Sequence, residues 1–216
     1  MHWELFGDLP PEEIRRVLAM ARRRTFSRGE VVFHEGDPAD SLHLIAKGRF
    51  AVRVTTPLGE TATLAIRGLG EAFGELALVS DAPRSATVAA LESAETHSLY
   101  RREFDELRRD HPYVNRMLVA VLAASVQRMD VLIVEAFYVG AEKRVLRRLR
   151  DLAAVYGNGS GPITVPLTQE DLAGLAGTSR ATVNRVLRDE ETRGTVTLGR
   201  GKTVVLDLEK LSRRAQ

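Results

Sequence analysis

Glycine spacing between residues 25 and 99 constrains the fold more than any other feature of this sequence. Seven glycines, at positions 29, 36, 48, 59, 68, 70 and 74, divide the stretch into short runs rich in Val, Ile, Leu, Phe and Thr. Runs of this composition are typical of strands, and the glycines mark the turns between them. Short, repeatedly interrupted strands predict an antiparallel jelly roll, also called a double-stranded β-helix.

The predicted strands fall in four segments, and a short helix precedes them. The segments are EVVFHEGD at 30–37, SLHLIAKGRFAVRV at 41–54, ETATLAI at 60–66 and TVAALESAETHSLY at 87–100. Prolines and acids open residues 9–24 and bases close them, which is the charge order of a helix.

A long helix is predicted to end near residue 139, and an apolar stripe runs along it with a period of 3.5 residues. The stripe consists of Leu118, Leu122, Ser125, Met129, Leu132, Ala136 and Val139. This is the spacing of a coiled-coil seam. The helix either lies on its own domain or pairs with a second copy. Extra apolar surface at Val121, Val131 and Val134 favours a parallel two-chain contact.

Charge is distributed unevenly along the chain, although its formal net value is only +2. Residues 1–139 carry 17 basic and 20 acidic side chains, whereas residues 140–216 carry 14 and 9. A basic segment of this kind is typical of a nucleic-acid-binding end, and a solvated charged surface would give the same count.

Several classes of protein are excluded by composition. The chain has no cysteine, which excludes disulfides and thiolate metal sites. No stretch approaches the roughly 18 apolar residues that a membrane span needs. The first residues lack the pattern of a signal peptide, and we therefore expect a cytoplasmic protein that does not bind a membrane.

Beyond Gly140, interpreted as a hinge or C-cap, residues 141–155 predict an amphipathic helix and residues 156–162 a glycine-rich loop. Residues 167–188, LTQEDLAGLAGTSRATVNRVLR, then have the pattern of a helix-turn-helix. Thr168 can cap the first helix, Gly177 supplies the turn, and Thr178 or Ser179 caps the second.

The second helix, here called the reading helix, separates into two faces on a helical wheel. The outward arc holds Arg180, Ala181, Asn184, Arg185 and Arg188, and the packing side holds Thr182, Val183, Val186 and Leu187. An arginine-bearing face suits the major groove, where the guanidinium fork can contact guanine. The alternative is an ordinary exposed charged face.

Further contacts with DNA are expected at phosphates. Short hydroxyl and amide groups at helix starts can reach the backbone, and the candidates are Thr168, Gln169, Ser179 and Thr182. Residues 195–207, TVTLGRGKTVVLD, predict a two-stranded wing with Arg200 and Lys202 near a phosphate. A dimer would present two such readers to a two-fold-symmetric operator.

The order of barrel, long helix and winged helix-turn-helix, with FGELALVSDAPRSA at 73–86 and TSRATVNRVLR at 178–188, resembles the cyclic-AMP receptor protein (CRP/FNR) family of bacterial transcription regulators. The resemblance covers residues 26–206. It implies an α+β protein in which residues 1–110 form a cyclic-nucleotide-binding β-roll, 111–139 a dimerisation helix and 140–216 a winged helix-turn-helix. It further implies a homodimeric, cyclic-AMP-responsive regulator that activates transcription through RNA polymerase.

In that family residues 73–86 form the phosphate-binding cassette, and this name is kept below. The matching residues are Gly74, Glu75, Leu76, Arg84, Ser85 and Ala86. A guanidinium suits a cyclic phosphate and a carboxylate suits a ribose hydroxyl, so Arg84 and Ser85 would hold the former and Glu75 the latter. The alternative is that Glu75 and Arg84 pair with each other, leaving an effector-independent activator with a vestigial pocket.

The sequence departs from the family at three places. Arg128 and Met129 stand where a Thr-Ser pair commonly contacts adenine, which leaves the base contact less defined than the phosphate contact. Ala181 replaces a frequent acidic residue, so the operator should differ at one base pair. Glu190 and Thr195 replace apolar residues between the reading helix and the wing, a change expected to loosen the wing.

An enzyme is the main rival class. The five histidines, His2, His34, His43, His97 and His111, are scattered without metal-ligand spacing. No nucleophile elbow, Walker loop or zinc signature is present. We therefore expect no catalytic activity and no metal.

Overall fold

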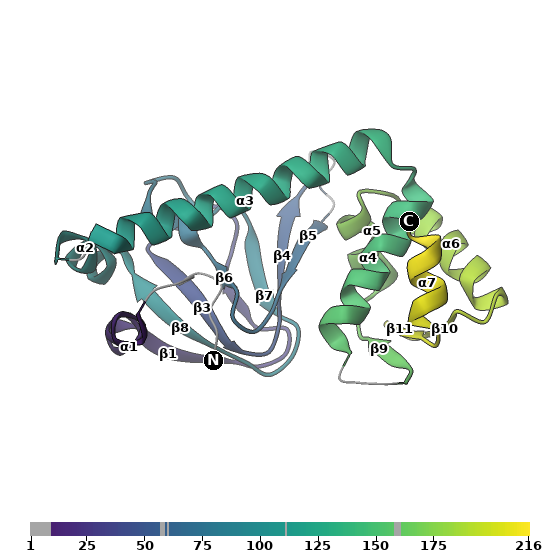
Figure 1. Ribbon diagram of the computed structural model, residues 1–216, viewed down its shortest axis with the longest axis horizontal. Coiled ribbons are helices and arrows are strands. Elements are labelled where there is room, and N and C mark those ends of the chain that lie inside the picture. The colour runs from purple at the N-terminus through teal and green to yellow at the C-terminus, as the bar shows by residue number, and fades with distance from the viewer. Residues whose placement is uncertain (1–9, 57–58, 60, 111, 158–160) are drawn as a thin grey trace. The chain divides into compact units, whose positions relative to one another are not determined.

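The computed structural model describes residues 10–56, 59, 61–110, 112–157 and 161–216 (Figure 1). His2, His111 and part of the predicted loop at 156–162 lie outside the described residues, as does the side chain of Val121. The chain divides into two compact units, Met1–Val54 with Ala65–Met129 and Thr55–Leu64 with Asp130–Gln216. The division falls within helix α3 (Pro112–Tyr138), inside the segment expected to be the dimerisation helix.

Two four-stranded sheets form the β-roll. One has the order β1 (Arg22–Phe26), β8 (Ala94–Tyr100), β3 (Ser41–Lys47), β6 (Ala72–Phe73). The other has the order β2 (Val31–Phe33), β7 (Thr87–Ala90), β4 (Phe50–Thr55), β5 (Thr61–Arg67). The strand pairs whose registers are described in this roll are antiparallel, which confirms the predicted jelly-roll architecture.

Apolar side chains from both sheets fill the roll. Strand β3 is almost wholly buried, and Leu42 lies opposite Leu99 in its pairing with β8. Phe26, Phe50 and Phe73 form an aromatic cluster, with the rings of Phe26 and Phe50 meeting edge to face at 5.6 Å. Such pairs add to the free energy of simple burial.

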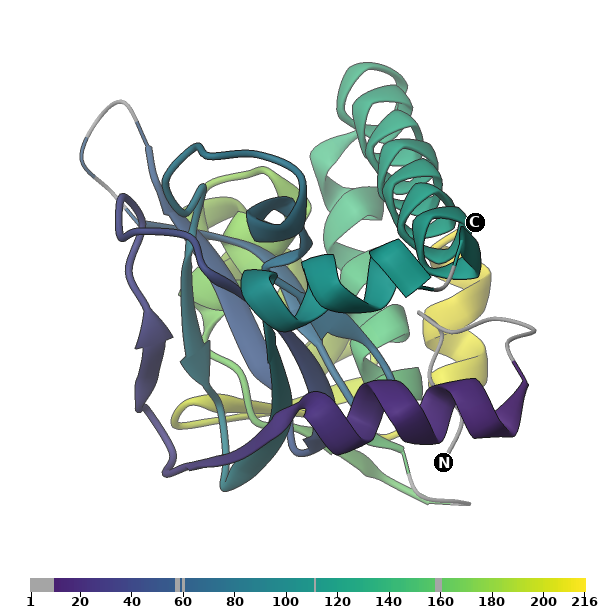
Figure 2. The same cartoon turned by 90° about the vertical axis from the view of Figure 1, so that its left-hand side faces the viewer.

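Helix α1 (Pro11–Met20) is shorter than the predicted helix at 9–24. That prediction was wrong beyond Met20, because Ala21 is extended and Arg22–Phe26 pair with β8 as strand β1. The three arginines read as a basic helix end belong to this strand, where tertiary pairing overrides local propensity. Helix α2 (Arg101–Asp110) follows β8, and α1 and α2 both contact that strand. Figure 2 shows α1 (purple) and α2 (teal) on the side of the roll that faces the viewer.

Helix α3 does not offer its whole predicted stripe to a partner. Leu118 is 6% exposed in the core of the first unit, and Leu122 packs against the same core, so this part of the helix lies on its own domain. Farther along the helix, apolar side chains are exposed, namely Val126, Met129, Val131, Leu132, Ile133, Val134, Phe137 and Tyr138. Val119 is also 64% exposed, and the consecutive residues 131–134 point to all sides of the helix, so the exposed apolar surface of α3 is not confined to one stripe.

After α3, the described residues of the second unit form four helices and a three-stranded sheet. These elements are α4 (Ala141–Tyr156), β9 (Ile163–Val165), α5 (Gln169–Ala176), α6 (Arg180–Thr192), β10 (Val196–Gly199), β11 (Lys202–Val205) and α7 (Leu208–Arg214). The sheet order β10-β11-β9 places the predicted wing beside β9, a strand that sequence reasoning missed along with α7. Val145, Leu149 and Leu187 are fully buried in this unit.

Gly140 begins α4 rather than ending α3. Its φ of −58° and ψ of 147° are those of an N-cap residue, so the C-cap interpretation is wrong, and the hinge interpretation stays a prediction. Within the described ranges, none of the helices combines the length and apolar character that a bilayer crossing demands.

Candidate effector site and nucleic-acid interface

Arg84, the cassette arginine, has a buried side chain bound by neutral oxygens. Its Nη1 donates to the Ser41 carbonyl oxygen at 2.7 Å, and its Nη2 donates to the Ser41 hydroxyl at 3.0 Å. The guanidinium carbon lies 4.0 Å from the centroid of the Phe33 ring, within cation–π range. The Nη2 atom is also 3.4 Å from Asp40 Oδ1.

The charge of Arg84 is only partly compensated by the protein. Burial lowers the pKa of Arg84, while the carboxylates of Asp40, Asp37 and Glu75 act in the opposite direction, and the guanidinium stays protonated. Asp40 has a side chain that is 67% exposed, so solvent screens its attraction. Among the described residues no partner accepts from the buried Nε of Arg84. An anion could supply both the missing charge and the missing acceptor.

Gly74 makes room for this guanidinium. Its φ is +80°, a left-handed conformation that glycine adopts without steric cost. A Cβ at this position would lie 2.7 Å from Arg84 Nη1 and 3.0 Å from the Ser41 carbonyl oxygen. Glycine is therefore needed here both for its backbone conformation and for the close approach of Arg84.

The other cassette residues are spread between the surface and the core. Glu75 is half-buried at the start of the 3₁₀ helix η2 (Glu75–Leu78). Leu76 and Ser85 are exposed, and Ala86 is 7% exposed. No hydrogen bond or ion pair joins the described side chains of Glu75 and Arg84. The pair of Glu75 with Arg84, considered as an alternative, is thus absent among the described residues. Arg84 binds Ser41 and Asp40 instead.

Sequence reasoning missed the residues that hold Arg84. The backbone N–H of Arg84 donates to the Asp37 carbonyl at 2.9 Å, and the Gly36 N–H donates to the Arg84 carbonyl at 2.9 Å. These bonds fix the cassette to the turn that follows β2. Residues 30–37 were predicted as a strand, but β2 ends at Phe33 and residues 34–37 form a turn. No local signal indicated which distant residue this turn would contact.

His43 extends the polar network below Ser41. It is 1% exposed, and its Nδ1 lies 3.1 Å from Thr96 Oγ1 and 3.0 Å from Ser98 Oγ. Its Nε2 lies 3.5 Å from the hydroxyl of Ser41. Burial lowers the pKa of His43 to about 3, with smaller contributions from Arg84 and Arg24. The imidazole is therefore neutral and serves as a hydrogen-bonding core residue.

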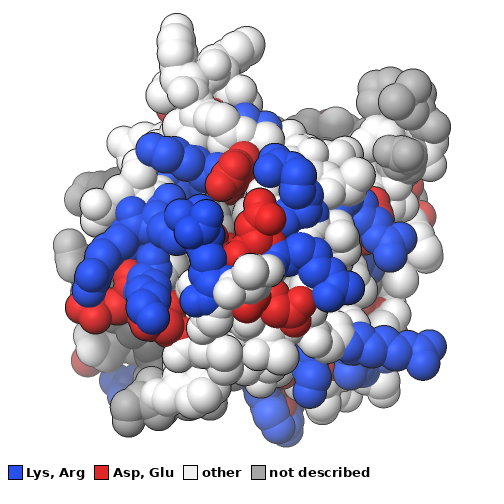
Figure 3. Space-filling model, turned by 90° about the vertical axis from the view of Figure 1, so that its right-hand side faces the viewer, with Lys and Arg blue, Asp and Glu red and all other residues white. Residues whose placement is uncertain are grey.

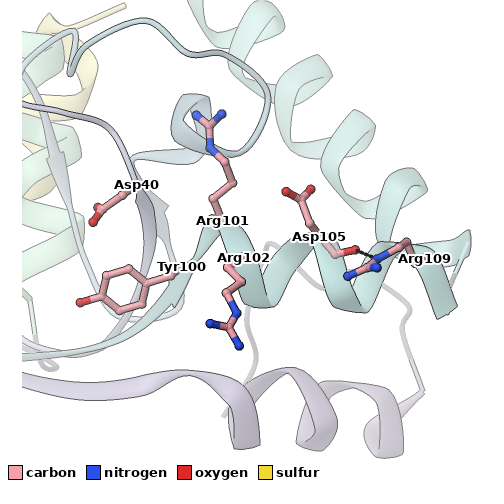
Figure 4. Close-up of a pocket in the computed structure, with 6 residues that line it drawn as sticks. All are labelled: Asp40, Tyr100, Arg101, Arg102, Asp105 and Arg109. Carbon is pink, nitrogen blue, oxygen red and sulfur yellow. Dashed lines mark hydrogen bonds between the residues drawn. The ribbon is translucent and has the colours of Figure 1, made fainter.

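A separate cavity of about 520 Å³ includes Asp40 in its lining (Figure 4). The full lining consists of Asp40, Tyr100, Arg101, Arg102, Asp105 and Arg109. Arg101 donates to Asp81 and to the Ser80 carbonyl, and Arg109 Nε donates to the Asp105 carbonyl at 3.1 Å. The protein's own oxygens hold these cations, and the lining contains no cassette residue.

The two candidate base-contacting residues lie on α3 and are exposed. Arg128 Nη2 donates to Ser125 Oγ at 2.9 Å, and Met129 is 53% exposed. Among the described residues no hydrogen bond or ion pair connects either of them to the cassette. The structure thus leaves these two side chains apart from Arg84.

The caps of the helix-turn-helix are those that the sequence predicted. Thr168 and Asp171 form a capping box at the start of α5, and Gly177, with φ +58°, ends that helix. Ser179, rather than Thr178, caps α6 by accepting from the Thr182 N–H at 3.1 Å. The hydroxyls of Thr168 and Ser179, predicted to contact phosphates, are exposed and serve as caps.

Arg144 of α4 joins two helix ends. Its guanidinium donates to the Val139 carbonyl at 2.6 Å, to the Ala176 carbonyl at 2.8 Å and to the Gly177 carbonyl at 2.9 Å. Carbonyls at helix C-termini lack intrahelical partners, and a cation there also matches the helix dipole. One side chain thus links the end of α3 to the turn that precedes the reading helix.

The outward arc of the reading helix, α6, is exposed as predicted. Arg180, Ala181, Asn184, Arg185 and Arg188 are all exposed, whereas Val183, Val186 and Leu187 are buried. Figure 3 shows lysine and arginine side chains gathered on one face with carboxylates among them.

Several of the predicted DNA-contacting residues bind each other or neighbouring acids. Asn184 Nδ2 donates to Gln169 Oε1 at 3.1 Å. Arg188 Nη1 lies 3.0 Å from Glu191 Oε2, and Arg185 Nη1 lies 3.8 Å from Asp189 Oδ2. These ion pairs are exposed, so each contributes little to stability and the arginines can exchange partners.

The wing is present, and its two unusual residues are hydrogen-bonded. Val196 pairs with Val205 across β10 and β11, and the exposed Arg200 and Lys202 lie at the turn. Glu190 is 0% exposed and accepts from Arg214 Nε at 2.6 Å. The Thr195 carbonyl accepts from the Leu206 N–H at 2.9 Å. The expected loosening of the wing therefore finds no support.

Potential metal ligands are scattered in the part of the chain that the structure describes. No group of three or more His, Cys, Asp or Glu residues there is arranged to hold a metal ion. His43, the most buried of the described histidines, hydrogen-bonds to hydroxyls instead.

A β-roll with a cassette arginine, followed by a winged helix-turn-helix, defines a DNA-binding transcription regulator with a cyclic-nucleotide-binding domain. The chain matches the family model of the cyclic nucleotide-binding domain over residues 23–111 and that of the Crp-like helix-turn-helix domain over residues 143–214. This chain belongs to the CRP/FNR family.

Relatives of similar length support this membership. The chain is 36% identical over 201 residues to the cyclic AMP receptor protein of Thermus thermophilus, covering 93% of this chain and 91% of that one. It is 31% identical over 215 residues to the CRP-like cAMP-activated global transcriptional regulator of Mycobacterium tuberculosis, covering 98% and 96%. The crystal structure of the Thermus thermophilus catabolite activator protein aligns with a TM-score of 0.58 at 35% identity, covering 98% and 97%.

Proposed function

We propose that this regulator is a homodimer whose allosteric effector is cyclic AMP and which activates transcription through RNA polymerase. The observation that carries the proposal concerns Arg84, a buried cation. Among the described residues its Nε has no acceptor, and its one ion pair is with Asp40, which is 67% exposed. The relatives named as a cyclic AMP receptor protein and a cAMP-activated regulator support the choice of effector.

The cassette residues have distinct proposed roles. Arg84 and Ser85 bind the cyclic phosphate, and Glu75 accepts a hydrogen bond from the ribose hydroxyl. Gly74 allows the backbone to approach, while Leu76 and Ala86 flank the site. Because the phosphate carries a full negative charge, it can replace the exposed Asp40 carboxylate as the partner of Arg84. Arg128 and Met129 contact the base from α3.

Dimerisation is proposed through the exposed apolar side chains of α3 beyond Leu122. Ile133 and Phe137 are 53% and 79% exposed, and covering them with a second copy would remove a large apolar surface from water. Two copies of α6 would then read a two-fold-symmetric operator, with Arg180, Arg185 and Arg188 toward the bases and with Arg200 and Lys202 toward phosphates.

Cyclic AMP would act by shifting an equilibrium between two arrangements of the dimer. A ligand that binds one arrangement more tightly increases its population by that difference in affinity. The favoured arrangement is the one whose two reading helices match the groove spacing of the operator.

Titration calorimetry with cyclic AMP tests the effector. We expect Arg84→Ala to weaken binding by about 10- to 100-fold, since hydrogen bonds to a charged group contribute about 1.5–3 kcal/mol. Arg102, whose side chain is 87% exposed, is the matched control, and Arg102→Ala should bind as the wild type does. If the wild type binds no cyclic AMP, the proposed effector is wrong.

The second candidate is an effector-independent activator of the same fold. It is favoured by the bonds that Ser41 and Asp40 already make to Arg84, which hold the guanidinium without a ligand. A mobility-shift assay on genomic fragments with and without cyclic AMP separates the two. Equal shifts in both lanes would favour the second candidate.

The homodimer and the proposed absence of catalysis need separate experiments. Ile133→Glu places a charge among the exposed apolar side chains of α3 and should convert a dimer to a monomer in sedimentation equilibrium, while Arg102→Ala should not. Incubation with cyclic AMP should yield no 5′-AMP. Hydrolysis that purifies with the protein would support an enzyme instead.

A further inference from the structure

Glu190 is a buried carboxylate on the reading helix. Its side chain is 0% exposed, although the preceding buried positions of that helix face, Val186 and Leu187, are apolar. A carboxylate withdrawn from water destabilises the fold unless a cation and hydrogen bonds compensate it. Its Oε1 accepts from Arg214 Nε at 2.6 Å, and Arg193 Nε is at 4.0 Å. No partner for the buried Oε2 is found among the described residues.

The compensating arginine comes from α7, a helix that is itself firmly anchored. Leu211 and Ala215 are 0% exposed, and the Ala215 carbonyl accepts from Arg147 Nε of α4 at 2.9 Å. Asp207 caps the first turn by accepting from the Lys210 N–H at 2.9 Å. These contacts fix the position of α7, and with it the position from which Arg214 extends to Glu190.

Three helices meet at the Arg214 guanidinium. Its Nη2 lies 3.5 Å from Glu142 Oε1 on α4, and Glu142 Oε2 lies 3.9 Å from Arg185 Nη1 on α6. The Glu190 carbonyl accepts from the Thr195 N–H at 3.0 Å, where the chain turns toward the wing. A movement of Glu190 would consequently displace both the last turns of α6 and the start of the wing.

We propose that Arg214 is a positioning residue for DNA recognition, acting through Glu190 to set the placement of the reading helix and the wing. It does not contact DNA itself. This inference rests on the proposed role of α6 in reading the operator. The proposal also accounts for Glu190, because a buried carboxylate destabilises the fold unless it pairs with a cation such as Arg214.

Arg214→Met tests the proposal, because methionine keeps much of the apolar stem of arginine and removes the charge. Arg213→Met on the same helix is the control, since Arg213 is 70% exposed and pairs with Glu209, which is 85% exposed. In mobility shifts, we expect Arg214→Met to weaken operator binding by about 10-fold or more, and non-specific binding by less than about 2-fold. Arg213→Met should change the preference for operator over non-specific DNA by less than about 2-fold.

Two further measurements separate positioning from other roles. The salt dependence of operator binding should keep its slope in Arg214→Met, because a lost phosphate contact would lower that slope by about 1. Glu190→Gln combined with Arg214→Met should recover operator preference, because the amide leaves no unpaired charge. A lowered slope or a failure of this rescue would overturn the proposal. If Arg214→Met does not fold, Arg214→Lys, which keeps a charge, replaces it in the same binding measurements.

Failure of the proposed function would look different. If the wild type shows no preference for any operator, the reading role of α6 fails, whatever Arg214 does. Hydrogen exchange still tests the positioning: amides of residues 187–196 should exchange faster in Arg214→Met, and recover in the double variant, with or without DNA. Unchanged exchange there would overturn the inference by itself.

Discussion

Arg84 and Ser41 are joined by two hydrogen bonds, at 2.7 Å to the carbonyl oxygen and at 3.0 Å to the hydroxyl of Ser41. Both acceptors are neutral, so they orient the guanidinium without cancelling its charge. Asp40 lies farther away, at 3.4 Å, and is mostly in water. The β-roll thus presents a fixed, largely uncompensated cation, which is what recognition of a phosphate requires.

Gly74→Ala should weaken cyclic AMP binding by about 10-fold or more, because the new methyl group would lie 2.7 Å from Arg84 Nη1 and displace it. Gly29→Ala is the matched control: Gly29 also has a positive φ, +83°, but a methyl group there would meet no side chain or backbone within 4 Å beyond its chain neighbours. Both variants should lose about 1–2 kcal/mol of unfolding free energy from backbone strain. Denaturant titration and calorimetry measure the two effects, and equal ligand affinity would contradict the prediction.

His43 should make the β-roll sensitive to acid. Its pKa, lowered to about 3 by burial, lies below the ordinary value of 6.5, so the unfolded chain binds the proton more readily. The stability due to the neutral ring is complete above pH 6.5 and is lost as the pH falls toward 3. Between about pH 6 and 4, the wild type should lose about 1.4 kcal/mol per pH unit more than His43→Phe. Urea unfolding of both proteins at a series of pH values measures this difference. An equal change of unfolding free energy with pH in the wild type and in His43→Phe would contradict the prediction.

The reading helix and the wing should fail in different ways. Arg180→Ala and Arg185→Ala should each lose about 1–3 kcal/mol of operator binding while retaining non-specific binding. Lys202→Ala should weaken binding to all sequences alike and lower the salt slope by about 1. Fluorescence anisotropy with operator and scrambled duplexes over a range of salt concentrations distinguishes these outcomes. Full operator selectivity in both arginine variants would place α6 outside the groove.

Arg144→Met should destabilise the second unit, because the Val139, Ala176 and Gly177 carbonyls would lose a charged donor. We expect a loss of about 2 kcal/mol in unfolding free energy. Lys143→Met, at the exposed neighbouring position, should stay within about 0.5 kcal/mol of the wild type. Chemical denaturation measures both, and indistinguishable midpoints would show that these bonds contribute no net stability.

The jelly roll and the helix-turn-helix could be predicted because their signals are local. Glycines mark the turns of the roll, and Thr168, Gly177 and Ser179 carry out their capping roles within a few residues of the groups they satisfy. The exposed face of α6 follows from helical periodicity alone. These features need no knowledge of distant contacts.

The errors and omissions share a tertiary origin. Arg22–Phe26 form a strand because β8 pairs with them, and Leu118 is buried because its own unit covers it. Ser41 holds Arg84 across 43 residues of sequence. Helix α7 was missed although Asp207 precedes it as a cap and Leu208 and Leu211 follow with helical spacing. The importance of this short helix comes from the bond between Arg214 and Glu190. No local signal could have predicted that contact.

The contact between Gly74 and Arg84 also constrains how this protein can diverge. A side chain at position 74 is incompatible with the present guanidinium, so Arg84 would have to shorten or turn away first. A descendant that no longer needs an anion could lose the arginine and only afterwards accept a larger residue opposite it. In a lineage of descendants, loss of Arg84 should therefore precede replacement of Gly74. The time of the first substitution would show when anion binding was lost.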